Sequence, residues 1–400
     1  MSLPPIAPPA TIGILGGGQL GRMLALAARA MGYRIAVMDP DPDCPTAAIA
    51  DRQVVAGYDD VGGALRLAGL SDVVTYELEH VAADVVDAIA AQVPVRPGRV
   101  PLIITQDRIA ERRFVEEAGV AVAPWRAVRT TDDLRRAAAD VGMPLRVKAA
   151  TGGYDGRSQV RVATAPELEL ALERLGRPPG EAALAEKEMA FEMEVSIIVT
   201  RGVDGGATCY PLARNTHDEG ILAESVAPAP VGAEIADRAA HLGEQLAVAM
   251  GMVGTLTAEL FLMRDGQLVV NELAPRVHNS GHWTIEGAAT SQFEQHIRAI
   301  CGLQLGSTTA LAPTAMVNLL GTGAARPARL EAAGLAHAMA DQAAHLHLYD
   351  KRQVFERRKM GHLTALGSTV EDALERARAA AAHLHWADTD RVDRGKEGQR

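Results

Sequence analysis

The chain has 400 residues, of which 48% are hydrophobic and 22% charged, and its net charge at neutral pH is −10. This composition is typical of a soluble globular protein of two or three domains, and the acidic balance argues against a nucleic-acid partner, which would need a basic surface. No apolar run approaches the roughly 20 residues of a membrane span, and the three scattered cysteines fit a reducing cytoplasm without a disulfide framework.

A Rossmann-like domain is predicted over residues 11–105. Thr11–Leu15 has the pattern of a buried strand, and the glycine-rich turn Gly16–Gly21 follows it. A helical pattern over Arg22–Met31 and a second strand, Tyr33–Met38, complete a strand–turn–helix–strand unit. This unit predicts a doubly wound parallel sheet whose first turn can bind an anion at the start of a helix.

The glycine turn supports two interpretations. Asp39 follows Gly21 at about the distance where a dinucleotide-binding domain places the acid that binds ribose, so an NAD-dependent oxidoreductase is one of them. The other is a helix N-terminus that binds some other phosphate. A further buried strand, Asp72–Tyr76, ends in Glu77. Acids at the carboxyl end of a strand lie where such sheets bind ligands, although an acidic loop that only caps the next helix is an alternative.

A second glycine-rich segment follows a predicted domain boundary. Pro94–Thr105 is rich in proline and irregular, and a helix is expected over Gln106–Ala118. The strand Pro144–Lys148 then leads into Thr151–Gln159, whose glycines allow the backbone to wrap an anion. Lys148 stands where a phosphate-binding lysine would. The segment lacks the GKS or GKT of a Walker loop, and a plain glycine-rich hairpin is the alternative.

Two glutamates are predicted to face each other across a hairpin. Gly254–Arg264 and Gln267–Arg276 both alternate like strands, and Asp265-Gly266 between them is a strong turn signal. If this dipeptide is a two-residue loop, Glu259 pairs with Glu272, with Cβ atoms roughly 5 Å apart. Like charges so placed require a cation, and all-oxygen ligation suits Mg²⁺ or Mn²⁺ together with phosphate. A solvated hairpin with two incidental acids is the alternative.

The segment after this hairpin is rich in groups that can bind anions or neutral acceptors, namely Arg276, His278, Asn279 and Ser280. Further strands are expected at Ala315–Leu320 and Ala344–Tyr349. A basic cluster with Lys351 and Arg358 lies beyond them, and it either binds a phosphate or consists of solvated turn residues. An Ala-rich helix begins near Ala373. The Pro-rich leader, residues 1–10, and the charged tail, residues 389–400, are expected to be disordered.

Several motifs together identify a family. In chain order they read GGGQLGRM, QDR, KAATGGYDGRSQ, PLARNTHDEGIL, NELAPRVHNSGHWT, SQFEQHIRAI, YDK and RKMGHLT. From about Thr11 to Leu366 they resemble the N5-carboxyaminoimidazole ribonucleotide synthetase family of ATP-grasp ligases. The resemblance implies an α/β and α+β architecture, in which the Rossmann-like domain precedes an ATP-grasp domain over residues 106–300. The small lobe of that domain is expected at about 125–190, and a small β-rich C-terminal domain at 301–388.

The resemblance also implies a reaction. ATP, bicarbonate and 5-aminoimidazole ribonucleotide would give N5-carboxyaminoimidazole ribonucleotide, ADP and phosphate through carboxyphosphate, in de novo purine (IMP) biosynthesis. Phosphorylation makes chemical sense because bicarbonate is a poor electrophile and gains a leaving group. Such chemistry depends mostly on positioning and charge neutralisation. The family further suggests Mg²⁺, with Mn²⁺ as a possibility, and a cytoplasmic homodimer that binds neither nucleic acid nor membrane.

Carried over to this sequence, the family pattern assigns residues to each ligand. The residues expected to bind ATP are Arg108, Lys148, Gly153, Tyr154, Asp155, Gly156, Arg157, Ser158, Gln159, Glu186, Lys187, Glu188, Met189, Glu194, His217, Asn271 and Glu272. The residues expected to bind the aminoimidazole ribonucleotide are Gly18, Gln19, Leu20, Glu77, Tyr154, Arg276, His278, Asn279, Ser280, Lys351 and Arg358. The metal ligands are Glu259 and Glu272, and the catalytic residues are Arg276, His278 and Asn279.

Some alternatives stay open at this point. His278 can orient bicarbonate, accept a proton as the amine attacks, or only support its loop by hydrogen bonds. Two residues depart from the family pattern, since Ser158 replaces a frequent glycine and Arg112 a frequent lysine. An NAD-dependent oxidoreductase would leave the Gly153 segment and the glutamate pair unexplained, and a nucleotide sensor without catalytic activity is a third interpretation.

Overall fold

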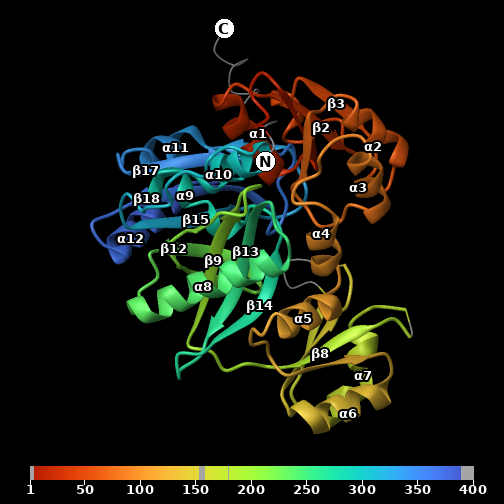
Figure 1. The fold of residues 1–400 in the computed structure, drawn as a ribbon. Helices are drawn as coiled ribbons and strands as arrows, with labels where there is room; N and C mark the ends of the chain where they lie inside the picture. The colour runs from red at the N-terminus through yellow and green to blue at the C-terminus, as the bar shows by residue number, and fades with distance from the viewer. Residues whose placement is uncertain (1–3, 153–157, 179, 389–400) are drawn as a thin grey trace.

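The computed structural model describes residues 4–152, 158–178 and 180–388, in which three main sheets build three regions (Figure 1). The N-terminal region lies at the top right of the view, a small lobe lies at the bottom, and a large sheet lies between them and extends to the left. Within the described residues, no helix is long and apolar enough to cross a lipid bilayer.

The N-terminal region is a four-stranded parallel sheet with the strand order β3–β2–β1–β4. Its strands are β1 (Thr11–Leu15), β2 (Arg34–Asp39), β3 (Arg52–Val55) and β4 (Val73–Tyr76). The helices of the region are α1 (Gln19–Ala30), α2 (Val61–Ala68), α3 (Ala83–Ala90) and α4 (Arg99–Gln106), with the short 3-10 helix η1 (Ala47–Ile49). The inner strands are buried, as is typical of a parallel sheet covered by helices. The predicted parallel sheet is therefore confirmed.

Two predictions about helices in this region were wrong. α1 begins at Gln19, three residues before the predicted Arg22, because Gly18 is already the N-cap. Pro94–Thr105 was expected to be irregular, yet it contains most of α4. Pro101 lies in the first turn of that helix, where the missing N–H would have had no partner in the helix. A proline at this position is compatible with the start of a helix and does not interrupt it.

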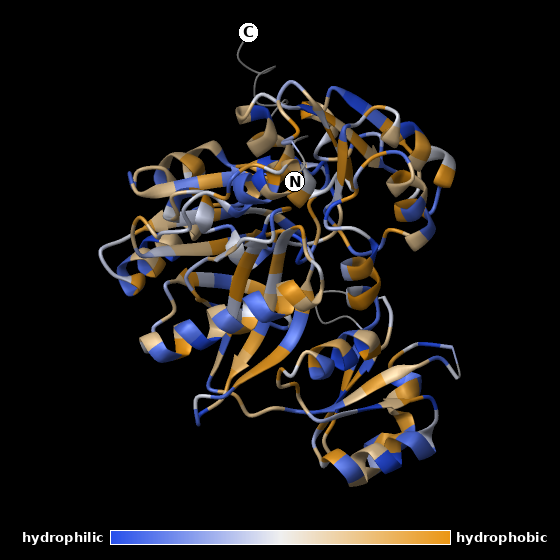
Figure 2. Cartoon of the chain, in the orientation of Figure 1, coloured by the Kyte–Doolittle hydropathy of each residue, from blue (hydrophilic) through white to orange (hydrophobic). Residues whose placement is uncertain are grey.

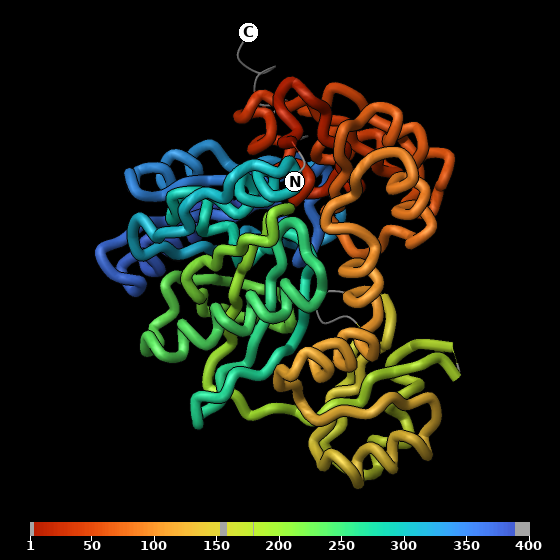
Figure 3. Tube along the Cα trace, in the orientation of Figure 1, coloured from red at the N-terminus to blue at the C-terminus, as the bar shows by residue number. Residues whose placement is uncertain are grey.

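The small lobe is a four-stranded antiparallel sheet with the order β5–β8–β6–β7. Its elements are β5 (Trp125–Val128), α6 (Thr131–Val141), β6 (Leu145–Ala149), β7 (Gln159–Val162), η2 (Ala165–Glu167), α7 (Leu168–Arg174) and β8 (Ala183–Lys187). A capping box of Thr130 and Asp133 begins α6. The tube view shows the lobe standing apart below the large sheet, with α5 (Arg108–Glu117) at their junction (Figure 3).

The large sheet has nine strands in the order β14–β13–β9–β11–β12–β15–β18–β17, with β10 paired to β9. Its strands are β9 (Met193–Arg201), β10 (Ala207–Cys209), β11 (Ala213–Asp218), β12 (Ile221–Ala227), β13 (Gly254–Leu262), β14 (Leu268–Ala274), β15 (Thr314–Leu320), β17 (Ala344–Leu348) and β18 (Lys359–Leu366). The other elements here are α8 (Ala233–Ala249), η3 (Asn279–Gly281), α9 (Thr284–Gly287), α10 (Gln292–Cys301), β16 (Ala328–Leu330), α11 (Ala332–Ala338), α12 (Val370–Ala381) and β19 (Trp386–Asp388).

The C-terminal strands continue the large sheet. β15 pairs with β12 in an antiparallel ladder, and β18 and β17 follow outward. α12 packs on β15 and β18, at the far left of the molecule in Figure 1. The β-rich C-terminal part predicted from the sequence is thus present, and it extends an existing sheet instead of forming a separate one.

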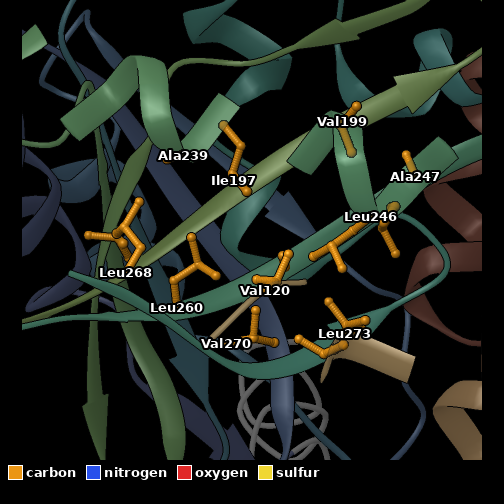
Figure 4. Packing of buried hydrophobic residues seen from close by; sticks show 14 of the residues in the cluster. Val120, Ile197, Val199, Ala239, Leu246, Ala247, Leu260, Leu268, Val270 and Leu273 are labelled. Carbon is orange, nitrogen blue, oxygen red and sulfur yellow. The ribbon is translucent and has the colours of Figure 1, made fainter. Parts of the chain in front are cut away.

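α8 covers one face of the large sheet and buries an apolar core. Its Ala239 and Leu246 pack against Ile197 and Val199 of β9 (Figure 4). At Gly243 an added Cβ would lie 3.3 Å from Ile197 Cγ2, so the absent side chain lets the helix approach the strand closely. Hydrophilic residues lie along the outward side of α8 (Figure 2), as expected for a helix with one side in water. This packing fixes the central strands β9 and β13.

A buried histidine joins the N-terminal region to the large sheet. His296 of α10 is fully buried, and its Nε2 lies 2.8 Å from Thr75 Oγ1 on β4. Its Nδ1 accepts a hydrogen bond of 3.1 Å from the backbone N–H of Thr255 on β13. Burial lowers the pKa of His296 to about 4, so the ring is neutral at neutral pH.

Acid should destabilise the protein partly through His296. Its pKa is about 4 in the folded chain and about 6.5 in an unfolded chain. The unfolded state therefore binds a proton first as the pH falls, and stability is lost between these two values, on the order of 2 kcal/mol from pH 7 to pH 5. In His296→Gln, which keeps a donor and an acceptor, the urea midpoint should fall less over this interval than in the unaltered protein.

His241→Gln is the matched control because it replaces an exposed histidine on α8. Its midpoint should fall as far as that of the unaltered protein. Equal falls in all three proteins would show that His296 does not bind its proton differently in the folded and unfolded states.

Candidate active site

The predicted glutamate pair is present, although the turn beside it differs from the prediction. Glu259 of β13 and Glu272 of β14 lie directly opposite each other. The turn is not a two-residue loop, because Met263 N–H donates to Gln267 O at 2.8 Å and leaves three residues between them. Gly266 supplies the positive φ, 82°, that such a loop needs. A three-residue loop alone would move the register by one residue and separate the two glutamates.

A β-bulge at Asn271 restores the register. Beyond Glu259 the ladder shifts, so that Leu260 pairs with Val270 and Asn271 is the extra residue of β14. The bulge is anchored from outside the hairpin, since Asn271 O accepts a 2.6 Å hydrogen bond from Arg112 Nη2 on α5. Val270 N–H donates to the carbonyl of Ala121 at 2.8 Å. The turn and the bulge each add one residue, and the predicted pairing is correct because the two shifts cancel.

The two glutamates form a site that fits a hard divalent cation. Burial and the charge of Glu272 raise the pKa of Glu259 to about 7, although His217 partly opposes this shift. Such a raised pKa shows that a second negative charge is unfavourable here without a counter-charge. Within the described residues, no group of three or more His, Cys, Asp or Glu side chains is arranged to hold a metal ion. A cation between the pair would therefore take its other oxygens from a ligand such as a phosphate.

A buried charge network supports the neighbouring lysine. Glu186 of β8 contacts Lys148 Nζ through one carboxylate oxygen and Arg112 Nη2, at 3.0 Å, through the other. Burial alone would raise the pKa of Glu186, but the charges of Lys148 and Arg112 lower it to about 2. Arg112 Nη1 also contacts Glu111 at 2.7 Å. Because Arg112 binds β8 and the bulge of β14 together, it fixes the lysine relative to the glutamate pair.

The glutamate pair, Lys148 and Glu186 line one cleft of about 770 Å³ between the small lobe and the large sheet. The predicted site residues that line it are Gln19, Leu20, Arg108, Lys148, Ser158, Gln159, Glu186, Lys187, Glu188, Met189, Glu194, His217, Glu259, Asn271, Glu272, Arg276, His278 and Asn279. Gly153, Tyr154, Asp155, Gly156 and Arg157 lie outside the described residues, so their predicted contacts with ATP and substrate stay predictions.

Sequence reasoning missed several residues that line the cleft. Phe191 and Phe261 stack with ring centroids 4.5 Å apart and form an apolar wall beside the Glu186–Met189 segment. Lys359 and Arg146 add positive charge to the cleft. Phe191, Phe261 and Arg146 stand singly in strand-like or turn-like sequence, and no motif marks them, whereas Lys359 lies in the RKMGHLT motif but was given no role. Their positions become visible when the strands are paired.

Glu77 is not among the residues that line the cleft, so its predicted contact with the substrate stays a prediction. Its carboxylate accepts hydrogen bonds from the backbone N–H groups of Gly18 and Gly21, the latter at 2.6 Å. Burial raises the pKa of Glu77, while the two glycine amides oppose the shift. In the structure, two amides of the glycine turn, those of Gly18 and Gly21, thus bind a carboxylate of the protein itself.

The acid that suggested NAD is also engaged within the protein. Asp39 Oδ2 accepts hydrogen bonds of 2.7 Å from Gly17 N–H and from the Tyr58 hydroxyl. Asp39 is buried, so its carboxylate is not presented to a ribose. The structure therefore gives no support to the dinucleotide interpretation of this turn.

The C-terminal basic cluster divides into two parts. Lys351 Nζ donates to Gln19 Oε1 at 2.5 Å and to Lys359 O at 2.6 Å, so it reaches the edge of the cleft through Gln19. Arg358 instead donates to the carbonyl of Gln353 at 2.7 Å and lies over the ring of Phe355. Neither side chain lines the cleft directly.

Arg276 and Asn279 present polar groups to the cleft. Glu79 holds the Arg276 guanidinium through two contacts of 2.8 and 3.0 Å. The Asn279 amide is nearly fully buried, and neither its oxygen nor its nitrogen has a hydrogen-bond partner among the residues that the structure describes. A buried amide is costly without partners, so a ligand group is expected to supply them.

The pKa values of His217 and His278, two of the histidines that line the cleft, shift in opposite directions. Burial would lower the pKa of His217, but its hydrogen bond to Glu194 and the charge of Glu259 raise it. Burial, together with the positive charge of Arg276, lowers the pKa of His278 well below its ordinary value. His278 Nε2 lies 3.3 Å from Glu259 Oε1. Ser280, predicted to bind substrate, is fully buried behind His278 and does not line the cleft.

Family models match most of the chain in three segments. Residues 9–106 match a ribonucleotide synthetase preATP-grasp domain, and residues 113–293 match an ATP-grasp domain. Residues 314–376 match a phosphoribosylaminoimidazole carboxylase C-terminal domain. The predicted order of an N-terminal parallel-sheet domain, an ATP-grasp domain and a C-terminal domain is thereby confirmed.

Curated relatives and solved structures agree with these models. The chain is 41% identical to an N5-carboxyaminoimidazole ribonucleotide synthase of Bacillus subtilis, over 94% of this chain and 96% of that one. It is 42% identical to a Brucella melitensis protein of the same name, over 90% and 97%.

Among solved structures, an ADP complex of N5-carboxyaminoimidazole ribonucleotide synthetase superposes with a TM-score of 0.87 at 42% identity, covering 94% of this chain and 97% of that one. An Aspergillus clavatus enzyme in complex with ADP and 5-aminoimidazole ribonucleotide superposes with a TM-score of 0.83 at 30% identity, covering 96% and 99%. The chain belongs to the N5-carboxyaminoimidazole ribonucleotide synthase family of ATP-grasp ligases.

Proposed function

We propose that the cleft carries out the reaction of this family, the ATP-dependent carboxylation of 5-aminoimidazole ribonucleotide, with bicarbonate as the source of the carboxyl group. The observation that carries the proposal is the placement of Lys148, the Glu259–Glu272 pair and the Arg276–Asn279 segment around one cavity. The first two suit a nucleoside triphosphate with its metal ion, and the third suits a small anion beside the reacting phosphate.

The reaction has two chemical steps. Transfer of the γ-phosphoryl group of ATP to a bicarbonate oxygen forms carboxyphosphate and releases ADP. The amine nitrogen of the aminoimidazole then attacks the carboxyl carbon, so that a C–N bond forms, the bond from carbon to the phosphate oxygen breaks, and phosphate leaves. The amine loses one proton. Both steps depend mainly on alignment of the reactants and on groups that neutralise charge.

ATP is proposed to lie along the small lobe. The stacked rings of Phe191 and Phe261 give the base an apolar wall, and the Glu186–Met189 segment supplies the polar edge beside it. Glu194, which contacts His217, is proposed to bind the ribose hydroxyls of ATP. Lys148 is then the cation for the phosphates, because Arg112 fixes Glu186, the carboxylate partner of Lys148.

Glu259 and Glu272 are proposed to hold Mg²⁺, or Mn²⁺, together with phosphate oxygens. When bound, the cation would neutralise charge on the phosphates. Arg276, fixed by Glu79, supplies a positive charge. Burial would lower the pKa of its guanidinium, but the carboxylate of Glu79 raises it. Asn279 offers an unpaired donor and an unpaired acceptor to the carboxyl group. The ribonucleotide is placed toward Gln19 and Lys351, where the N-terminal region meets the C-terminal strands.

The assembly and the compartment are proposed from the family resemblance and the cysteines. A homodimer in the cytoplasm is expected, and the three cysteines are free in the structure. Sedimentation of the purified protein tests the dimer.

ADP release should require both other substrates. If the cleft carboxylates the aminoimidazole ribonucleotide, ADP should form rapidly only when ATP, bicarbonate and 5-aminoimidazole ribonucleotide are all present. A coupled assay for ADP, run with each component left out in turn, measures this. ADP release that does not respond to the ribonucleotide and bicarbonate would contradict the proposed reaction. Reduction of NAD with a hydroxy substrate would instead support the oxidoreductase interpretation.

Glu272→Gln should abolish turnover while leaving the fold intact. The charge of Glu272 raises the pKa of both Glu259 and Glu111, two buried carboxyl groups, so removing it should hold or raise the melting temperature. Turnover should fall roughly 100-fold or more, because the phosphates lose a metal ligand and the charge that it positions.

Glu234→Gln, at an exposed position in the first turn of α8, is the matched control and should change neither turnover nor melting temperature. Full activity of Glu272→Gln at ordinary Mg²⁺ concentrations would rule out the metal assignment. A large drop in its melting temperature would show that the pair is structural instead.

A further inference from the structure

The imidazole of His278 is held from behind by groups that do not line the cleft. His278 is the N-cap of the 3-10 helix η3, and its Nδ1 accepts a hydrogen bond of 3.3 Å from the backbone N–H of Ser280. The Ser280 hydroxyl lies 2.9 Å from the same nitrogen. Ser196 of β9 donates its own hydroxyl hydrogen to Ser280 Oγ at 2.9 Å. Ser196 and Ser280 are both buried.

The backbone N–H of Ser280 determines the direction of these bonds. An amide N–H can only donate, so this contact favours the tautomer in which Nδ1 of His278 accepts and disfavours the one in which Nδ1 carries the proton. The Ser280 hydroxyl then donates its hydrogen to Nδ1 and accepts the hydrogen bond from Ser196. In a neutral imidazole the remaining proton is on Nε2. That nitrogen points toward the cleft, where it lies 3.3 Å from Glu259 Oε1.

The loop itself is also fixed. Gln292, the first residue of α10 and fully buried, accepts a hydrogen bond of 2.9 Å from His278 N–H and donates one of 2.7 Å to His278 O. Gly281 makes room for this side chain, because a Cβ at that position would lie 2.6 Å from Gln292 Oε1. Both backbone groups of His278 are therefore bound to one side chain, which fixes the main chain from which the imidazole projects.

We propose that Ser280, held by Ser196, fixes His278 as the tautomer protonated on Nε2, so that His278 serves the carboxylation as a hydrogen-bond donor and not as the base that takes the amine proton. This inference rests on the proposed function. An Nε2–H group aimed into the cleft can stabilise negative charge on an oxygen of the carboxyl group or orient the carboxylate of Glu259. Ser196, Ser280 and Gln292 are positioning residues, since they act through His278.

The tautomer can be observed without any activity. In protein labelled with ¹⁵N at its 12 histidines, two-bond ¹H–¹⁵N correlation spectra at pH 7 distinguish an unprotonated nitrogen from a protonated one. The signals that vanish in His278→Gln identify the residue. An unprotonated Nδ1 with a protonated Nε2 is expected, and the other neutral tautomer or an imidazolium would overturn the proposal whether or not the enzyme carboxylates its substrate.

Two substitutions at His278 separate a donor from a loop support. The amide of His278→Gln reaches the position of Nε2 and keeps an N–H donor in the cleft. The amide of His278→Asn reaches only the position of Nδ1 but keeps a good N-cap for η3. A donor role predicts that the kcat of carboxylation is roughly tenfold or more higher in Gln than in Asn, with the same KM for ATP in both. An Asn variant as active as Gln, or more active, would overturn the donor role.

The role of the two serines is tested by removing the hydroxyl of Ser280 or of Ser196. Ser280→Ala removes one donor to Nδ1 but leaves the backbone donor, and Ser196→Ala leaves the Ser280 hydroxyl without the partner that orients it. In both variants the Nδ1-protonated tautomer should gain population and kcat should fall several-fold while KM for ATP stays the same. If neither variant changes the tautomer or kcat, the two hydroxyls do not position His278, and the proposed role of Ser196 and Ser280 is wrong.

Discussion

The structure depends on two carboxylates that are held opposite each other on the central hairpin. Burial raises the pKa of Glu259 to about 7, and the negative charge of Glu272 opposite it adds to the shift, although His217 opposes it. Strands would avoid such a pairing if only their own stability were at stake. A bulge at Asn271, anchored by Arg112, imposes it. Unfavourable local electrostatics maintained by surrounding structure is typical of a site that is completed by a ligand.

Arg112 connects this pair to the other half of the site. It contacts Glu186, which in turn contacts Lys148, and it also binds the carbonyl of Asn271. One buried guanidinium thus sets the distance between the groups proposed for the phosphates and those proposed for the metal ion. Breaking a buried ion pair usually costs several kcal/mol, because the remaining charge is left without a partner. The network therefore fixes the small lobe to the large sheet at the cleft.

Much of the fold and the family could be predicted from the sequence, because local patterns carry that information. Alternation gave β13 and β14, and contiguous motifs marked the cleft. The prediction that Glu259 faces Glu272 was correct even though its assumed turn was wrong. The bulge that compensated for the turn is held by Arg112, which is distant in sequence, and nothing in the hairpin itself reveals it.

Other features could not be predicted because they arise from packing between distant segments. Glu77 was expected to meet a ligand, yet the amides of Gly18 and Gly21 bind it across the first sheet. Phe191 and Phe261 become an aromatic wall when β13 pairs beside β9. A sequence shows which residues can bind an anion, but a choice between an external anion and a carboxylate of the chain requires the packed structure.

The location of the metal ion tests the central claim most directly. Crystals of the protein grown with Mn²⁺ and a non-hydrolysable ATP analogue would give an anomalous difference map in which the ion is identified by its own scattering. The account predicts a peak between the carboxylates of Glu259 and Glu272, at roughly 2.2 Å from oxygens of both, with phosphate oxygens on its other side. A fully occupied nucleotide whose Mn²⁺ peak lies away from both glutamates would contradict it.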